Sequence, residues 1–410
     1  MNVAEHPAPE RLGMLIVAPF ERGREHGGSQ RATALAERME DRGVEVHWRR
    51  IGASHTSKRQ KAADMLRLQP MYLRFYPPPA SPRPAVESAA HIALAAHSFL
   101  APQLDATPSS VVRVVDFHNL EWQHLADSAR LERRGSTFVD AARALHLRVQ
   151  VRLLRRFERT VVRRTDLCLF VSEAERAWAR RIAPTGNLIL VPSILPRSTE
   201  QAALSIADRR EAHSAPRTQQ LVYVGTLTFP PNVMSLKAFL ASTWPQIRRA
   251  CPEAELLVAG EAPTPLRAEI DGIPGARALG YVANLASITE RCAGALMPID
   301  GHAGTSLRVL YYALARIPVI GTPAAFRGFG SQVGVRAGSP AEWTQAVRVL
   351  LGHGAACDGR ARLIDDAQRA VLQMQRDPTP WDHLHGELAR LVRLRRRGER
   401  EQKHLHRAHR

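Results

Sequence analysis

The sequence is poor in cysteine, in aromatic residues and in acidic side chains relative to basic ones, and each shortage excludes a class of protein. Its four cysteines are scattered, with neither a CxxC pair nor the spacing of metal ligands, which argues against a disulfide framework or a zinc site. They are typical of small buried residues in a reduced, cytoplasmic protein. The four are Cys168, Cys251, Cys292 and Cys357.

Long hydrophobic runs are also missing. No uninterrupted apolar run approaches the ~18 to 20 residues that a membrane-spanning helix needs. The opening stretch, MNVAEHPAPERLG, has no apolar core and no cleavage pattern, so we expect no secretory signal there. With 45% hydrophobic residues the chain can still form sizeable cores, and its 410 residues predict two domains rather than one.

The deficit of acids leaves a strong positive charge. Asp and Glu number 39 against 57 Lys and Arg, for a formal net charge of +18. Between residues 130 and 181 arginine outnumbers acids by fourteen to six, and the stretch RLVRLRRRGEREQKHLHRAHR is also basic. Such patches favour phosphate groups, whether of a nucleotide, an anionic lipid or nucleic acid. Nucleic acid is the weakest of the three, because no recognition motif is present and few aromatic residues stand among the arginines.

A helix is predicted over residues 141–164. Apolar residues recur there at every fourth position, which is typical of a stripe that faces a core, and arginines occupy the other faces. Two interpretations stay open: a core-facing helix with a solvated basic side, or a surface that touches an anionic membrane or a lipid-phosphate acceptor. The apolar stripe is Leu145, Val149, Leu153, Phe157 and Val161, and the basic candidates are Arg148, Arg152, Arg155, Arg156 and Arg159.

Strand and helix patterns alternate along both halves of the chain. MLIVAPF, residues 14–20, is fully apolar, as expected of a central parallel strand covered on both faces. A glycine-bearing loop, a helical pattern and a second strand follow, with the loop at the carboxyl end of the first strand, where open sheets bind ligands. The alternation restarts at QLVYVGT, residues 220–226, and continues through IPVIGTP, residues 317–323. The sequence therefore predicts an α/β fold of two doubly wound halves, with substrates in the cleft between them.

The ordered series of motifs resembles a two-domain glycosyltransferase of the GT-B fold, in the retaining family 4 and its bacterial branch for polysaccharide or glycolipid assembly. The resemblance covers most of residues 14–390. Its clearest pieces are YVGTLTFPPNVMSLKAFL, PEAELLVAG, GYVANL, AGALMPID, GTSLRVLYYALARIPVIGTP and PWDHL, and weaker ones, DFHNLEWQHL and LVPS among them, lie in the N-terminal half.

This resemblance implies two Rossmann-like domains that face each other across a cleft. It also implies transfer of a hexosyl group from a nucleotide-sugar, UDP- or GDP-linked, to a carbohydrate or lipid-linked acceptor, with retained configuration. No metal or other cofactor is expected. The expected location is cytoplasmic, with attachment to the inner face of a membrane as an open alternative.

The domain boundaries follow from the same patterns. The stretch 196–219 is polar and strand-free, which suits an interdomain linker. The predicted parts are a disordered start (1–13), an N-terminal acceptor-side domain (14–195), the linker (196–219), a C-terminal nucleotide-sugar-binding domain (220–375), a helix packing back toward the N-terminal domain (376–394) and a basic tail (395–410).

The resemblance assigns the donor to the C-terminal domain, and the chemistry of a diphosphate agrees with the residues there. Unpaired N–H groups at a helix N-terminus favour anions, and small residues precede a helix predicted to begin near Leu307. A cationic side chain should balance the leaving phosphate, and Arg308 is the nearest candidate. The donor-binding candidates are Gly225, Thr226, Gly304, Thr305, Ser306, Arg308 and Tyr311.

In the N-terminal half the candidate catalytic residue is His118. The resemblance implies a histidine near the transferred sugar, and a histidine that only hydrogen-bonds a loop is the open alternative. Glu121 follows it and could equally begin a helix as a first-turn acid. Gly27 and Gly28 suit a loop that passes close to the diphosphate from the opposite domain.

The donor stretch also departs from the family pattern. Members commonly carry two glutamates separated by seven residues, and an ungapped alignment places Ala303 and Tyr311 in their positions. A carboxylate on the ribose hydroxyls makes charge-assisted bonds of ~1.5 to 3 kcal/mol each, and a phenol replaces only one of them. Arg327 and Arg316 stand where an acid and a helix-ending glycine are expected. The alternative hypothesis is therefore a catalytically weak or inactive GT-B protein that serves as a partner or scaffold in a biosynthetic cluster.

Overall fold

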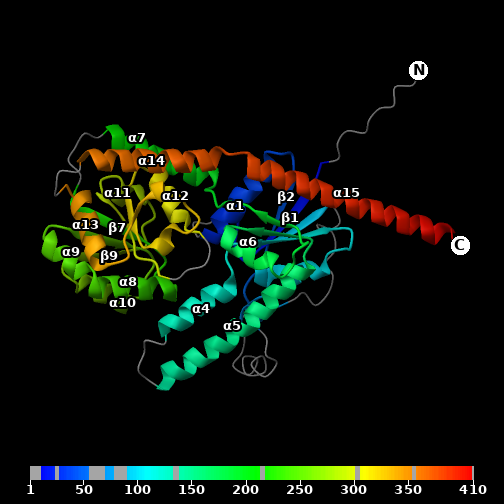
Figure 1. Ribbon diagram of the computed structural model, residues 1–410, viewed down its shortest axis with the longest axis horizontal. Helices are drawn as coiled ribbons and strands as arrows, with labels where there is room; N and C mark the ends of the chain where they lie inside the picture. The colour runs from blue at the N-terminus through cyan, green and yellow to red at the C-terminus, as the bar shows by residue number, and fades with distance from the viewer. Residues whose placement is uncertain are drawn as a thin grey trace. The chain divides into compact units, whose positions relative to one another are not determined.

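Two sheets of six parallel strands organise the chain (Figure 1). The computed structural model describes residues 11–23, 27–54, 70–77, 90–132, 138–212, 218–300, 305–352 and 357–408. Contacts divide the chain into two compact units. The first consists of Met1–Trp122, Arg148–Pro192 and Pro378–Arg410, and the second of Gln123–Leu147 and Ser193–Asp377.

The sheet of the first unit has the order β2-β1-β3-β4-β5-β6. Met14 and Ile16 of β1 are completely buried, as expected of a parallel strand covered on both faces. The strands are β1 (Gly13–Ala18), β2 (Glu45–Arg50), β3 (Ile92–Ala95), β4 (Val112–Phe117), β5 (Leu167–Phe170) and β6 (Leu188–Leu190). The helices are α1 (Gly27–Glu40), α3 (Tyr72–Phe75), η1 (Ser98–Ala106), α6 (Glu173–Arg180) and α15 (Thr379–Ala408), and the contact boundary between the units falls within α4 (Glu121–Glu132) and α5 (Phe138–Arg164).

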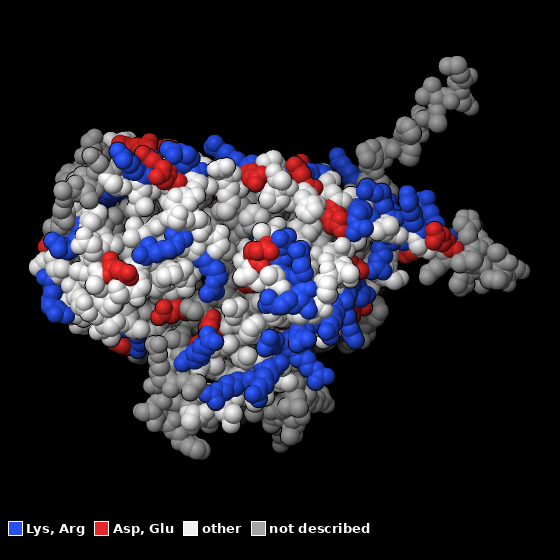
Figure 2. Space-filling view, viewed as in Figure 1, with Lys and Arg blue, Asp and Glu red and all other residues white. Residues whose placement is uncertain are grey.

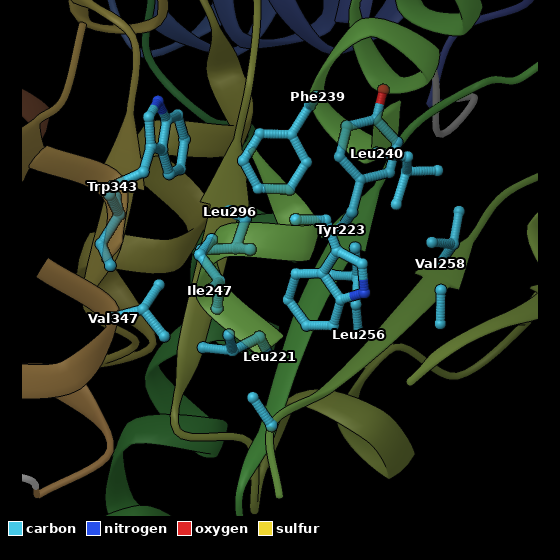
Figure 3. Close-up of a cluster of buried hydrophobic side chains, with 14 of the residues drawn as sticks. Leu221, Tyr223, Phe239, Leu240, Ile247, Leu256, Val258, Leu296, Trp343 and Val347 are labelled. Carbon is cyan, nitrogen blue, oxygen red and sulfur yellow. The ribbon is translucent and has the colours of Figure 1, made fainter. Parts of the chain in front are cut away.

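The sheet of the second unit has the order β12-β11-β10-β7-β8-β9. Figure 3 shows its core, in which Leu221 and Tyr223 of β7 pack with Leu256 of β8 and with Trp343. The strands are β7 (Gln220–Val224), β8 (Glu255–Ala259), β9 (Ala276–Gly280), β10 (Gly294–Met297), β11 (Val319–Gly321) and β12 (Val335–Arg336). The helices are α7 (Arg197–Ala212), α8 (Pro230–Ser242), α9 (Trp244–Ala250), α10 (Thr264–Asp271), α11 (Ala286–Thr289), α12 (Leu307–Leu314), η2 (Pro323–Phe326), η3 (Ser331–Val333), α13 (Pro340–Leu350) and α14 (Cys357–Arg376).

The stretch expected to be a linker, residues 196–219, contains the helix α7. Ala203 and Ile206 of α7 are buried in the core of the second unit. Just before the helix, the backbone N–H of Leu195 donates to Oε1 of Gln375 over 2.8 Å. The apolar residues of α7 are small and few, so the helical period in its sequence is weak. Only the contact of α7 with the core shows that this helix belongs to the second unit.

The C-terminal helix is longer than predicted. The single helix α15 begins at Thr379 and covers most of the predicted helix 376–394 and most of the predicted tail 395–410. Trp381 and Leu388 bury its first half in the first unit, and Arg395 forms an ion pair with Asp166. Of the predicted disordered start, residues 1–10 lie outside the described residues. None of the described helices is both long enough and apolar enough to cross a membrane.

The helix predicted over 141–164 is confirmed as α5, but its buried face differs from the predicted stripe. Leu145 and Val149 are 61% and 36% exposed. Leu154 is buried instead, together with the polar side chains of Gln150 and Glu158. A strict four-residue repeat drifts round a helix of 3.6 residues per turn, and hydrophobicity cannot reveal a polar residue whose partners lie elsewhere in the chain.

Candidate functional site

In the second unit, the turn after β7 meets the first turn of α12. Gly225 follows β7 directly, and Nη1 of Arg308 donates to the carbonyl oxygen of Val224 over 2.5 Å. The guanidinium carbon of Arg308 lies 5.9 Å from the centre of the Tyr223 ring. A Cβ atom on Gly225 would stand 2.9 Å from Nη1 of Arg308, so a side chain at this position would displace the guanidinium. The structure thus brings together two of the predicted donor-binding residues.

The same turn is held by the strand next to it. The N–H of Gly225 donates to the carbonyl oxygen of Ala259 over 2.9 Å, and that of Leu227 to Glu261 over 2.9 Å. Gly260, with φ of +145°, packs so closely that a Cβ atom there would stand 1.8 Å from the carbonyl oxygen of Gly225. Only glycine fits both requirements. The sequence patterns did not single out Gly260, although its place at the end of an apolar strand was a signal.

The residues before α12 lead into the helix that carries Arg308. Ser306 is the N-cap of α12, and its side chain makes no capping hydrogen bond. Oγ1 of Thr305 donates to Oγ of Ser193 over 2.6 Å. Thr226 lies in the turn after Gly225, and its carbonyl oxygen accepts from the side-chain amide of Asn232 over 3.0 Å. Gly304 lies outside the described residues. A helix N-terminus next to the Arg308 guanidinium is an arrangement that can bind a diphosphate.

Tyr311 also lies on α12, but its partners differ from those of Arg308. Burial raises the pKa of its phenol, and a hydrogen bond with Thr289 acts against that rise. Its ring meets the buried ring of Tyr312 edge to face, with the ring centres 5.8 Å apart. The hydroxyl of Tyr311 is therefore engaged with α11, whereas Arg308 on the same helix is engaged with β7.

In the first unit, His118 follows β4 and belongs to a buried charged cluster. Nε2 of His118 lies 3.0 Å from Oδ2 of Asp116, and the His118 side chain is only 7% exposed. Asp116 is completely buried and accepts from both Nε and Nη2 of Arg31, over 3.0 and 2.7 Å.

The electrostatics of this cluster fix its protonation. Burial lowers the pKa of His118 to about 4; His97 acts in the same direction, and Asp116 opposes it. Burial alone would raise the pKa of Asp116, but the Arg31 guanidinium and His118 outweigh that effect and hold it well below its usual range. At neutral pH the cluster therefore combines a neutral imidazole with an ionised, fully paired carboxylate.

A second histidine, His97, lies against the first. The two ring centres are 4.1 Å apart, and Nδ1 of His97 is 3.2 Å from Oε1 of Glu121. Gly27 and Gly28 are the first two residues of α1, and a Cβ atom on Gly28 would stand 3.3 Å from Nε2 of His97. The same Cβ atom would stand only 2.9 Å from Cε1 of Phe20, so the glycine leaves room for the Phe20 ring first and for this imidazole as well. His97 was not among the predicted site residues, although a histidine after a short apolar run was a signal.

Glu158 supports the cluster from α5. It is completely buried and accepts from Oγ of Ser98 over 2.6 Å and from the backbone N–H groups of Glu121 and Trp122 over 3.1 and 3.3 Å. It therefore binds the N-terminus of α4, which Glu121 begins as its first-turn acid. Burial raises the pKa of Glu158 to about 8; the Ser98 hydrogen bond opposes this, and the charge of Glu121 adds to it.

The predicted basic surface lies on the opposite side of α5. Arg148, Arg152, Arg155, Arg156 and Arg159 are all exposed. Arg155 also lies over the Trp122 ring, with 4.9 Å between the guanidinium carbon and the ring centre.

Comparison with known proteins gives these sites a context. Residues 218–353, which include Gly225 and Arg308, match the family model described as Glycosyl transferases group 1. No curated protein matches the chain. Among solved structures, the α,α-trehalose 6-phosphate synthase of Burkholderia multivorans is similar with a TM-score of 0.59 and 11% identity, over 95% of this chain and 99% of that one.

Two further structures show the range of similarity. Anabaena Alr3699/HepE in complex with UDP-glucose is similar with a TM-score of 0.52 and 11% identity, over 92% of this chain and 99% of that one. S. aureus TarM matches with a TM-score of 0.48 and 10% identity, over 73% of this chain, and the match spans only 55% of TarM. The similarity at TM-scores above 0.5 and the two parallel sheets together confirm the predicted fold class, a two-domain α/β GT-B fold.

Proposed function

We propose that the protein is a glycosyltransferase that moves a sugar from a nucleotide-sugar donor, and that its second unit binds the donor. The observation that carries this proposal is the Arg308 guanidinium held at the Gly225 turn, inside the stretch that matches Glycosyl transferases group 1. HepE, which shares the fold, binds UDP-glucose. Both the cation and the helix N-terminus favour a diphosphate.

The donor is proposed to be a UDP- or GDP-linked hexose, transferred with retained configuration. Under that scheme the donor phosphate itself takes the acceptor proton, so no protein nucleophile is needed, and backbone donors with Arg308 stabilise the leaving diphosphate. Arg308 would then supply the charge that a metal ion supplies elsewhere, so no metal or other cofactor is proposed.

The acceptor side is assigned to the first unit and its histidine cluster. A neutral imidazole can accept a hydrogen bond from a sugar hydroxyl, and the Asp116 carboxylate beside Nε2 favours the tautomer that leaves Nδ1 free to accept. The proposed acceptor is a carbohydrate or lipid-linked sugar in polysaccharide or glycolipid assembly. We place the enzyme in the cytoplasm, on the inner face of the membrane.

A second candidate function is an inactive GT-B protein that binds partners in a biosynthetic cluster. Tyr311 favours it, because its ring packs edge to face against the buried ring of Tyr312 and a phenol replaces only one of the bonds that a carboxylate makes to the ribose hydroxyls. The experiment that separates the two is a panel of UDP- and GDP-sugars with nucleotide release and heat of binding both recorded. Release with any donor supports the enzyme, binding without release supports the inactive protein, and no binding refutes a nucleotide-sugar site of either kind.

A further inference from the structure

The exposed side of α5 carries a continuous row of side chains that mixes two chemistries. The row runs at alternating spacings of four and three residues, which keeps every member on one face of a helix. Its first two members are apolar and exposed, and the others are exposed arginines. The members are Leu145, Val149, Arg152, Arg156, Arg159 and Arg163.

This row lies on the exposed face of α5. The buried side chains of α5, among them Leu154 and Glu158, stand on the opposite face. From Leu145 to Arg163 the row is about 27 Å long, since a helix rises about 1.5 Å per residue. A surface of this length on one straight element suits contact with something flat.

The positive charge on this face has few acidic neighbours along the helix. Glu158 is the one acid in the sequence from 144 to 164, and it is completely buried. Among the side chains that the structure describes, none of the α5 arginines from Arg148 to Arg164 forms an ion pair. Figure 2 shows Lys and Arg gathered along this helix. A hollow of about 520 Å³ opens there, and its lining is Arg152, Arg155, Arg156, Arg159, Thr160 and Arg163.

We propose that this face of α5 docks the protein flat on an anionic lipid bilayer. The arginines would bind lipid phosphates, and their apolar stems can lie along the interface while the guanidinium groups reach the head groups. Leu145 and Val149 would enter the region between head groups and acyl chains, since an exposed Leu beside arginines gains free energy by leaving water.

The exposed apolar residues distinguish a bilayer from a nucleic acid. Charge alone would serve either partner, because both carry rows of phosphates. A nucleic-acid surface of this kind would use aromatic platforms between its arginines, and the exposed row contains none. Leu145 and Val149 match the apolar layer that only the bilayer offers.

The experiment is cosedimentation of the full chain with vesicles. Vesicles of phosphatidylcholine alone are compared with an equimolar mixture of phosphatidylcholine and phosphatidylglycerol. We expect binding to the mixture only. The variant Arg152→Glu, Arg156→Glu and Arg159→Glu should bind at least about a hundredfold more weakly, at about 1 kcal/mol for each arginine lost near the surface.

A matched control carries the same change of charge elsewhere. Arg249, Arg277 and Arg348 are exposed arginines of the second unit. Their triple substitution by Glu should leave vesicle binding within about threefold of the wild type, because a screened charge acts only near the lipid surface. An equal loss in both triple variants would overturn the proposal, since net charge and not α5 would then explain binding. Equal thermal melting temperatures of all variants would show that they are folded.

The double variant Leu145→Ser and Val149→Ser tests whether these two apolar side chains insert into the bilayer. It should bind about tenfold more weakly to the mixed vesicles, and more so at high salt, where the arginine contacts are screened. Unchanged binding would refute insertion. The wild type is also tested with a single-stranded and a duplex oligonucleotide. If it binds either one more tightly than the mixed vesicles, and if this binding also depends on the three arginines, the choice of a bilayer is overturned. Vesicle binding needs no turnover, so its outcome is independent of the proposed sugar transfer.

Discussion

Each unit places an arginine beside the carboxyl end of a parallel strand, and the two arginines have different partners. In the first unit the buried Arg31 is bound by both carboxylate oxygens of Asp116. In the second, the half-buried Arg308 donates to a backbone carbonyl, and no carboxylate among the described residues pairs with it. A guanidinium already matched by a carboxylate supports the fold, whereas one without such a partner is available to an anionic ligand.

The largest effect is expected from breaking the pair in the first unit. Arg31→Met leaves the buried Asp116 carboxylate without its guanidinium and with only the neutral His118 beside it, which should lower the free energy of unfolding by about 3 to 5 kcal/mol. Urea unfolding followed by far-UV circular dichroism measures it. Arg31→Met combined with Asp116→Asn should recover most of the loss. A loss below about 1 kcal/mol in the single variant would show that the pair does not support the fold.

The buried Glu158 of the first unit makes the free energy of unfolding depend on pH. The unfolded carboxyl ionises near pH 4.5, but in the folded chain its pKa is about 8. Between these values the unfolded state binds fewer protons, so the stability falls as the pH rises from about 4.5 to about 8. The contribution of Glu158 to this fall between pH 5 and pH 8 is roughly 3 kcal/mol. Urea unfolding at both pH values should show a much smaller fall in Glu158→Gln.

In the same cluster, His118 makes the free energy of unfolding change with pH in the opposite direction. Its pKa is 6.5 when unfolded and about 4 when folded, so its contribution is complete above pH 6.5 and is lost as the pH falls toward 4. His118→Asn should therefore make the stability fall more steeply between pH 5 and pH 7 than in the wild type, because the rise that His118 contributes no longer offsets the fall that Glu158 contributes. A parallel shift of the two curves would argue against a buried neutral imidazole.

In the second unit the change expected is in binding and not in stability. Arg308→Ala removes a charge-assisted contact to phosphate of about 1.5 to 3 kcal/mol, a loss of about ten- to more than a hundredfold in affinity for UDP or GDP. Calorimetric titration measures it, and Arg308→Lys should keep part of the affinity. The free energy of unfolding should change by less than about 1 kcal/mol. Unchanged nucleotide affinity in Arg308→Ala would refute its place in the donor site.

The smallest effect concerns Arg316, a paired arginine of the second unit. It has a φ of +56°, which costs a non-glycine residue about 1 kcal/mol, and it forms ion pairs with Asp365 and Glu211 over 2.6 and 3.0 Å. Arg316→Gly loses the pairs but also the strain, whereas Arg316→Ala loses only the pairs. We expect the glycine variant to be about 1 kcal/mol more stable than the alanine variant in thermal unfolding. Equal stability would mean that the backbone is not strained.

Helix α12 shows how far local patterns reach. Its start near Leu307 and the strand that ends before Gly225 both follow from periods of two to four residues and from the ordered motifs. Local patterns did not predict the helix α7 or the short strand β3. Their alanine-rich stretches contain little contrast between apolar and polar positions, so no helical or strand period stands out. Strand β3 is identified by its pairing with β1 and β4.

The sequence by itself determined the alternation of strands and helices, the two-part α/β class and the basic character of α5. The tertiary structure alone decided which polar groups are buried together: His97 against His118, Glu158 under the start of α4, and Tyr311 on Thr289. It also decided that Leu145 is exposed. The physical reason is the distance along the chain between the residues that interact. A helical or strand period is set by neighbours a few residues away, but burying a polar group requires hydrogen-bond partners from distant parts of the chain, and no local pattern records them.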